Sequence, residues 1–119
     1  MNRALDKSRP ICPQIEELIC VMIATGEIKG GEKIFSVREV ALKFSVNPNT
    51  VQKAFEALEA KQLLTSHRGS GWYVNEDTSR AAEMVEELKR VKTCEYVKSM
   101  TNLGVSENEL IDYIKEWNK

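Results

Sequence analysis

Two helix-start signals that lie close together constrain the fold of this chain more than any other feature of the sequence. In the first, Ser36 and Glu39 have the spacing of a capping box, in which each side chain satisfies a backbone N–H group at the start of a helix. In the second, Asn47 is an N-cap residue followed by Pro48, the residue best suited to the first helical position. Only a short turn that begins at about Ser45 separates the two helices, which predicts a helix-turn-helix.

Apolar residues recur at helical spacing around these signals and mark three helices. The first helix is expected after Pro13, with Gly26 as its stop, and the other two follow the start signals. The residues expected to be buried are Ile15, Leu18, Ile19, Met22 and Ile23 in the first helix, Val37, Val40, Ala41 and Phe44 in the second, and Val51, Ala54, Phe55 and Leu58 in the third. Extended runs at 63–67 and 72–74 flank a Gly-containing turn at 68–71 and predict a hairpin. The expected fold is therefore a winged helix-turn-helix, mainly α with a small β-hairpin wing.

The polar face of the third helix is the first candidate for binding DNA. At about 100° per residue, Asn49, Gln52, Lys53 and Glu56 lie opposite the apolar stripe, with Thr50 at the margin. Amide side chains can pair with adenine edges, and a lysine can reach guanine or a phosphate. A carboxylate deep in the groove would meet phosphate repulsion, so we expect only the first two turns to enter. Such a polar face is equally typical of any solvent-exposed helix.

The predicted hairpin tip is the second candidate. Arg68 stands beside Gly69 and Ser70, so its cation and the two backbone N–H groups could approach a phosphate or the minor groove. A solvated turn is the alternative interpretation. We expect His67, the only histidine, to be a hairpin side chain and not a catalyst or ligand.

The composition is that of an ordinary globular protein and excludes several classes. With 42% hydrophobic and 29% charged residues in 119, the chain is unlike a disordered protein. No apolar run approaches the roughly 18 residues of a membrane span, and residues 1–7 lack a signal-peptide core, so we expect a cytoplasmic protein without a membrane partner. Cys12, Cys20 and Cys94 lack CxxC spacing, which fits reduced thiols better than disulfides or a zinc site. Catalytic motifs are absent from the sequence, so we predict no enzymatic activity, cofactor or metal.

The net charge of −1 conceals an asymmetry along the chain. Residues 1–75 hold 10 Lys and Arg against 8 Asp and Glu, whereas residues 76–119 hold 7 against 10. Gly, Pro and Asn punctuate the chain before Glu76 and almost disappear after it. We therefore predict two parts: the winged helix-turn-helix, the candidate DNA-binding domain, at 1–75 and a helical segment, the candidate dimerisation segment, at 76–119.

The C-terminal segment is expected to form two helices with unpartnered apolar faces. A long helix should run from about Ser79 to Leu103, and a capping box from Ser106 to Glu109 should open the last one. The apolar residues expected to form a dimer interface are Met84, Leu88, Val91, Val97, Met100, Leu110, Ile111, Ile114 and Trp117. Two helices cannot bury these faces fully on each other, so a partner surface is implied. The alternative is that the segment folds back on its own domain.

Several of these motifs, in this order, resemble the GntR family of bacterial transcriptional regulators. The matching runs are 36–41, 46–59 and 68–74, preceded by 10–15 and 26–34. The resemblance implies that DNA is contacted by Ser36, Arg38, Asn47, Asn49, Thr50, Gln52, Arg68, Gly69 and Ser70, beside Lys53 from the polar face of the third helix.

The chain departs from the family pattern at two positions. Phe35 stands where the family usually has Pro, and Gln62 where a Gly usually closes the third helix. Gln62 is therefore expected in the left-handed conformation.

The short tail resembles the YtrA-type subfamily, which implies a homodimeric repressor of an inverted-repeat operator, with half-sites about one helical turn apart. Control of a transporter operon is a further implication of the resemblance, and a small-molecule effector stays open. The main alternative is a protein-interaction module, because winged helices also serve as docking domains.

Overall fold

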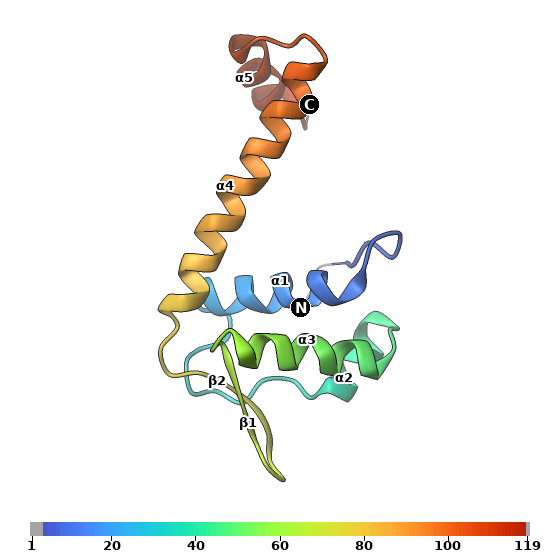
Figure 1. Ribbon diagram of the computed structural model, residues 1–119, viewed down its shortest axis with the longest axis vertical. Helices are drawn as coiled ribbons and strands as arrows, with labels where there is room; N and C mark the ends of the chain where they lie inside the picture. Colours follow the sequence, from blue (N-terminus) through green and yellow to red (C-terminus); the bar gives the residue numbers. More distant parts are fainter. Residues whose placement is uncertain (1–3, 119) are drawn as a thin grey trace. The chain divides into compact units, whose positions relative to one another are not determined.

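The computed structural model describes residues 4–118 and divides into two compact units, the first ending at Val85 and the second beginning at Glu86. Two residues of the charge count, Arg3 and Lys119, lie outside the described residues. The same is true of residues 1–3 in the N-terminal run that lacks a signal-peptide core. The elements in order are α1 (Ile11–Ala24), α2 (Val37–Phe44), α3 (Pro48–Ala60), β1 (Leu64–His67), β2 (Gly71–Val74), α4 (Ser79–Asn102) and α5 (Glu107–Glu116) (Figure 1). The chain is mostly helical with one antiparallel hairpin, as the sequence predicts.

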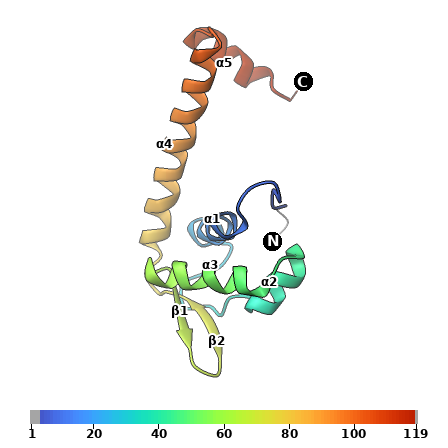
Figure 2. The ribbon, with the colours of Figure 1, turned by 45° about the vertical axis from the view of Figure 1, so that its right-hand side comes forward.

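The core of the first unit lies between α1, α2 and α3. In both ribbon views α1 lies next to α3, and the wing projects from the end of α3 at which β1 begins (Figures 1 and 2). All thirteen residues predicted to face the core are buried, except Val37, which is half-buried against it. Residues from the connections and the wing complete the core: Ile28, Ile34, Leu63, Leu64 and Val74.

Helix α1 begins at Ile11, earlier than the predicted start after Pro13. Pro13 is tolerated inside the first turn because the backbone N–H groups there have no partner within the helix. Phe35, the first departure from the family pattern, packs half-buried against the core.

The wing is bordered by a segment that precedes the helix-turn-helix in the sequence. Strands β1 and β2 pair from Leu64↔Val74 to His67↔Gly71, and Lys33 forms a bridge with Tyr73. The backbone N–H of Ile34 donates to the Trp72 carbonyl at 2.9 Å, and that of Val74 donates to the Glu32 carbonyl at 2.8 Å. Each strand of the wing therefore has a different outer neighbour, the segment 31–34 beside β2 and α3 beside β1.

Helix α4 begins in the first unit and continues into the second. In the first unit, Ala81 is buried and its carbonyl accepts from the Cys20 thiol at 3.5 Å. In the second unit, Ser106 caps α5 by accepting from the Glu109 backbone N–H at 3.3 Å. The Glu109 carboxylate accepts from the Ser106 hydroxyl at 3.2 Å, in place of the backbone N–H that a full capping box uses. No helix within residues 4–118 is both long enough and apolar enough to cross a bilayer.

Candidate nucleic-acid interface

Arg38 lies in the first turn of α2, and the capping box holds that turn in place. The Ser36 hydroxyl oxygen accepts from the Glu39 backbone N–H, and the Glu39 carboxylate accepts from the Ser36 backbone N–H, both at 3.0 Å. The first of these bonds uses one lone pair of the Ser36 hydroxyl oxygen. Arg38 is exposed and makes no hydrogen bond or ion pair within residues 4–118.

The capping box also sets the charge of Glu39. Hydrogen bonds from the backbone and then the side chain of Ser36 hold the pKa of the Glu39 carboxyl below its ordinary value, with Lys33 adding a smaller effect. The carboxylate is therefore ionised at neutral pH, where it accepts hydrogen bonds best.

The exposed face of α3 begins at its own cap. The Asn47 Oδ1 accepts from the Asn49 backbone N–H at 2.8 Å, which leaves the Asn47 side-chain amide protons for another acceptor. Farther along the helix, the Gln52 Nε2 donates to the Glu56 Oε1 at 3.0 Å. Because a carboxylate only accepts, this bond turns the Gln52 amide so that its NH₂ faces Glu56.

A groove of about 800 Å³ separates α3 from the wing. Its lining includes Gln52 and Glu56 on the helix side and Arg68 on the wing side. The structure therefore brings Gln52 and Arg68, predicted from separate motifs, to one concave surface. Lys53 is not part of this lining. Asn49 and Thr50 also lie outside the groove, in the first turn of α3.

The wing tip is an ordered turn. Gly69 has a φ of 79° with open space around it, and the Ser70 backbone N–H donates to the His67 carbonyl at 2.9 Å. The Ser70 hydroxyl shares a hydrogen bond of 2.6 Å with the Tyr73 hydroxyl, whose ring meets His67 edge-on at 4.5 Å. The turn therefore already uses the Ser70 backbone N–H, one of the two predicted to approach a phosphate. Arg68 is exposed and has no hydrogen bond or ion pair among the described residues.

Two side chains tie the wing to α3, and sequence reasoning identified neither tie. The Glu59 Oε2 accepts from the Ser66 backbone N–H at 3.1 Å and from the Ser66 hydroxyl at 2.9 Å. The Phe55 and Trp72 rings meet edge-on with centroids 5.6 Å apart. Both contacts join residues of different elements, so no local spacing in the sequence signals them.

The apolar residues predicted for a dimer interface differ in exposure. Trp117 is 80% exposed and Ile114 52% exposed, whereas Leu110 is buried and Met84 packs against the core of the first unit. The others are half-buried or exposed: Leu88, Val91, Val97, Met100 and Ile111. Three further apolar or aromatic residues of this region, none of them among the predicted interface residues, are also exposed: Tyr96, Leu103 and Tyr113.

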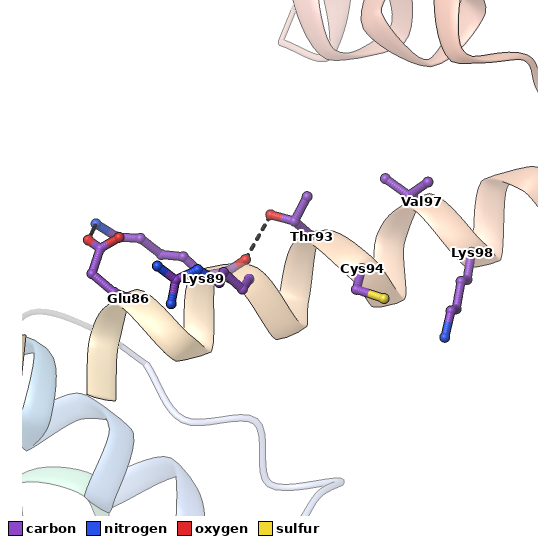
Figure 3. A pocket seen from close by; sticks show the side chains of 7 residues that line it. Glu86, Lys89, Thr93, Cys94, Val97 and Lys98 are labelled. Carbon is purple, nitrogen blue, oxygen red and sulfur yellow. Dashed lines mark hydrogen bonds and ion pairs between the residues drawn. The ribbon is translucent and has the colours of Figure 1, made fainter. Parts of the chain in front are cut away.

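One face of α4 in the second unit carries mixed charged and apolar side chains around a hollow of about 570 Å³. Lys89 pairs with Glu86 at 2.8 Å, and the Thr93 hydroxyl donates to the Lys89 carbonyl at 2.7 Å (Figure 3). Cys94 is an exposed free thiol on this face. Within residues 4–118, no group of three His, Cys, Asp or Glu is arranged to hold a metal ion.

Comparison with known proteins gives a consistent result over most of the chain. Residues 13–74 match the profile of the family described as bacterial regulatory proteins, gntR family. The chain is 34% identical to the HTH-type transcriptional repressor YtrA of Bacillus subtilis (strain 168), over 92% of this chain and 85% of the relative.

Solved structures agree with the sequence comparisons. A GntR family transcriptional regulator from Listeria monocytogenes has a TM-score of 0.81 at 35% identity, covering 94% of this chain and 98% of that chain. The structure of AraR(DBD) in complex with operator ORE1 has a TM-score of 0.54 at 33% identity, covering 56% of this chain and 80% of that chain.

Proposed function

Because the chain belongs to the gntR family of bacterial regulatory proteins, we propose that it is a homodimeric repressor of the YtrA type that binds an inverted-repeat operator. The chain is thus a DNA-binding transcriptional regulator and not an enzyme. The observation that carries the proposal is the groove that Gln52 and Arg68 line together. A base-reading amide on α3 and a cation on the wing then face one DNA segment from two sides.

The proposed DNA contacts divide by chemistry. Arg38, Lys53 and Arg68 are cations for phosphates or groove edges, and Ser36 and Ser70 carry hydroxyl groups that can bond to a phosphate. The remaining proposed contacts are the side chains of Asn47, Asn49, Thr50 and Gln52 and the backbone of Gly69.

The test of DNA binding is a gel-shift titration with a fragment of the promoter upstream of the gene. We expect retention at moderate salt, competition by unlabelled promoter DNA and none by random DNA of equal length. Footprinting should then show two half-sites in inverted orientation, about one helical turn apart or slightly more. Equal competition by random DNA would favour a protein-docking module instead.

The proposed dimer interface is formed by the exposed apolar residues of the second unit. Within this unit, Ile111, Ile114 and Trp117 of the α5 region stay exposed, and exposed apolar surface of this kind marks an interaction site. A two-fold dimer would present two reading heads to the two half-sites.

Light scattering at micromolar concentration tests the dimer. We expect a dimer for the native chain and for Lys115→Glu, which changes a neighbouring charged residue on α5. Ile114→Glu should give a monomer that binds the operator more weakly, because it places a charge in the apolar interface. A monomeric native chain would contradict the proposal.

The regulated genes are proposed to include a transporter operon. Deleting the gene should raise the transcripts of that operon if the protein is a repressor, and lower them if it is an activator. Transcript measurement in the deletion strain and in a complemented strain distinguishes the two.

A further inference from the structure

We propose that Glu59 is a positioning residue that holds the wing against the recognition helix α3 and thereby places Arg68 for its contact with DNA. This inference rests on the proposed role of Arg68 in DNA binding. Glu59 itself need not touch DNA, because its carboxylate is occupied by the wing.

The first support is the geometry of the tie. One oxygen of the Glu59 carboxylate, Oε2, accepts both the backbone N–H of Ser66 at 3.1 Å and its hydroxyl at 2.9 Å. Two donors from one residue therefore hold this point of β1 to the Glu59 carboxylate. Bonds to a charged acceptor are stronger than those between neutral groups.

The second support is the place of Ser66 in the wing. Ser66 pairs with Trp72 in the hairpin and lies two residues before Arg68. The outer edge of β2 is held by backbone bonds from the segment 31–34, whereas β1 has α3 as its outer neighbour. A two-stranded hairpin is only marginally stable by itself, so the tie to β1 matters for its orientation.

The third support is the rigidity of the anchor. Glu59 follows Leu58, which is fully buried together with Val51, Ala54 and Phe55 on the inner face of α3. Phe55 also meets Trp72 edge-on, so an apolar contact and a polar tie join the same two elements. The end of α3 is therefore held by the core. Because the Glu59 side chain extends from this helix end and bonds to Ser66, it holds the wing in a fixed position relative to the core.

The fourth support is electrostatic. Glu59 lines the groove between α3 and the wing, where it adds a negative charge to a surface proposed to approach phosphates. That charge opposes DNA binding, at a cost that added salt reduces. If Glu59 had no positional role, the protein would bind DNA more tightly with an uncharged residue in its place.

The experiment compares Glu59→Gln with Glu59→Ala. Both remove the charge, but glutamine keeps one oxygen that can accept both bonds from Ser66, whereas alanine keeps none. Operator affinity is measured as a function of salt for both variants, for Arg68→Ala, and for the double variant Glu59→Ala with Arg68→Ala. Ser66→Thr, which keeps the hydroxyl, and Ser66→Ala form a second matched pair.

We expect Glu59→Gln to bind the operator at least as well as the native chain. Glu59→Ala should bind about three- to tenfold more weakly, the range expected for losing surface hydrogen bonds that position a contact. Its salt slope should fall toward that of Arg68→Ala, which lacks about one phosphate contact. In the Arg68→Ala background, adding Glu59→Ala should cause no further loss, because there is no cation left to place.

Hydrogen exchange at the Ser66 amide reports the tie in the free protein. Protection should persist in Glu59→Gln and fall in Glu59→Ala, while the amides of α3 stay protected in both. This control separates loss of the tie from loss of the fold.

Two results would overturn the inference while leaving the proposed function intact. One is equal operator binding by Glu59→Ala and Glu59→Gln, and the other is an undiminished loss from Glu59→Ala in the Arg68→Ala background. If Arg68→Ala alone changes neither affinity nor salt slope, the proposed role of Arg68 fails and takes this inference with it.

Discussion

At the scale of single residues, several proposed DNA contacts are also parts of the fold. Ser36 caps α2 and Asn47 caps α3, and each uses its side-chain oxygen as the acceptor of the cap. A substitution at either position would therefore change both stability and DNA binding. Arg38 and Gln52 have no such capping role and separate the two effects better.

Arg38→Ala should weaken operator binding and reduce the salt slope by about one, because one phosphate contact and its released counterion are lost. Thermal unfolding should hardly change, since Arg38 has no hydrogen bond or ion pair within residues 4–118. Arg38→Lys is the control that keeps the charge and should keep most of the slope. A slope equal to that of the native chain in Arg38→Ala would remove this residue from the proposed contacts.

Gln52→Ala should change base preference at one position of each half-site, with discrimination there falling by about 1–3 kcal/mol. Glu56→Gln should cause a smaller loss at the same position, because a second amide can face Gln52 with either its NH₂ or its oxygen and no longer fixes the orientation. Binding to a panel of operators with single base changes measures both effects. Loss spread evenly over all positions would contradict the base-reading role.

At the scale of elements, the capping box makes the start of α2 sensitive to acid. The folded-state pKa of Glu39 is lowered, so its contribution to stability is complete above the ordinary value near 4.5 and is lost as the pH falls through the lower folded value. Asp6, Asp77 and Glu86 also have lowered pKa values, from hydrogen bonds to Ser8, Ser79 and Lys89 respectively. The acid dependence of the whole chain therefore has several sources.

Comparison of Glu39→Gln with the native chain isolates the contribution of Glu39. The variant should be less stable at neutral pH, and the difference should shrink as the pH falls below about 4.5. Ser36→Ala, which removes the N-cap acceptor, should cost about 1 kcal/mol at neutral pH. Urea unfolding between pH 3 and 7 measures both, and a constant difference between Glu39→Gln and the native chain would contradict the lowered pKa.

The end of α3 carries a strained residue. The resemblance to the gntR family predicts this strain, because the family usually has a glycine at this position. Gln62 has a φ of 68°, in the left-handed region where a side chain is unfavourable and glycine is not. Gln62→Gly should stabilise the fold by up to about 1 kcal/mol, since the Asn75 side-chain NH₂ donates at 2.6 Å to the backbone carbonyl of residue 62, which a glycine keeps. Gln62→Ala, which keeps the strain, should show no gain, and thermal unfolding of the three proteins compares them.

The three helices, the hairpin and the buried stripes could be predicted from the sequence because their signals are local. Ser36, Asn47 and the spacing of apolar residues act within one or two turns of chain. The start of α1 was misplaced because Pro13 is tolerated in a first turn. The tie between Glu59 and Ser66 could not be predicted, because it depends on how α3 and β1 pack.

At the scale of the whole molecule, the charge asymmetry depends on where the chain is divided. Residues 1–75 have a balance of +2, but the unit that ends at Val85 holds 11 Lys and Arg and 11 Asp and Glu. A neutral unit has no general positive field to attract DNA. The proposed affinity must therefore come from the local placement of Arg38 and Arg68 and from doubling by symmetry.

The bridge between Lys33 and Tyr73 has a consequence for how the protein folds. It closes a loop that contains both helices of the helix-turn-helix, so the chain entropy of that closure is lost only when strand β2 reaches the segment 31–34. The wing should then form late and slowly in folding. The loop that contains the two helices nevertheless stays open until the wing has formed. In native-state hydrogen exchange, the amides of Ile34 and Val74 should open together with those of α2, as one cooperative foldon. If the wing amides exchanged by an opening with a much lower free energy than that of α2, the closure of this loop would be independent of the two helices inside it.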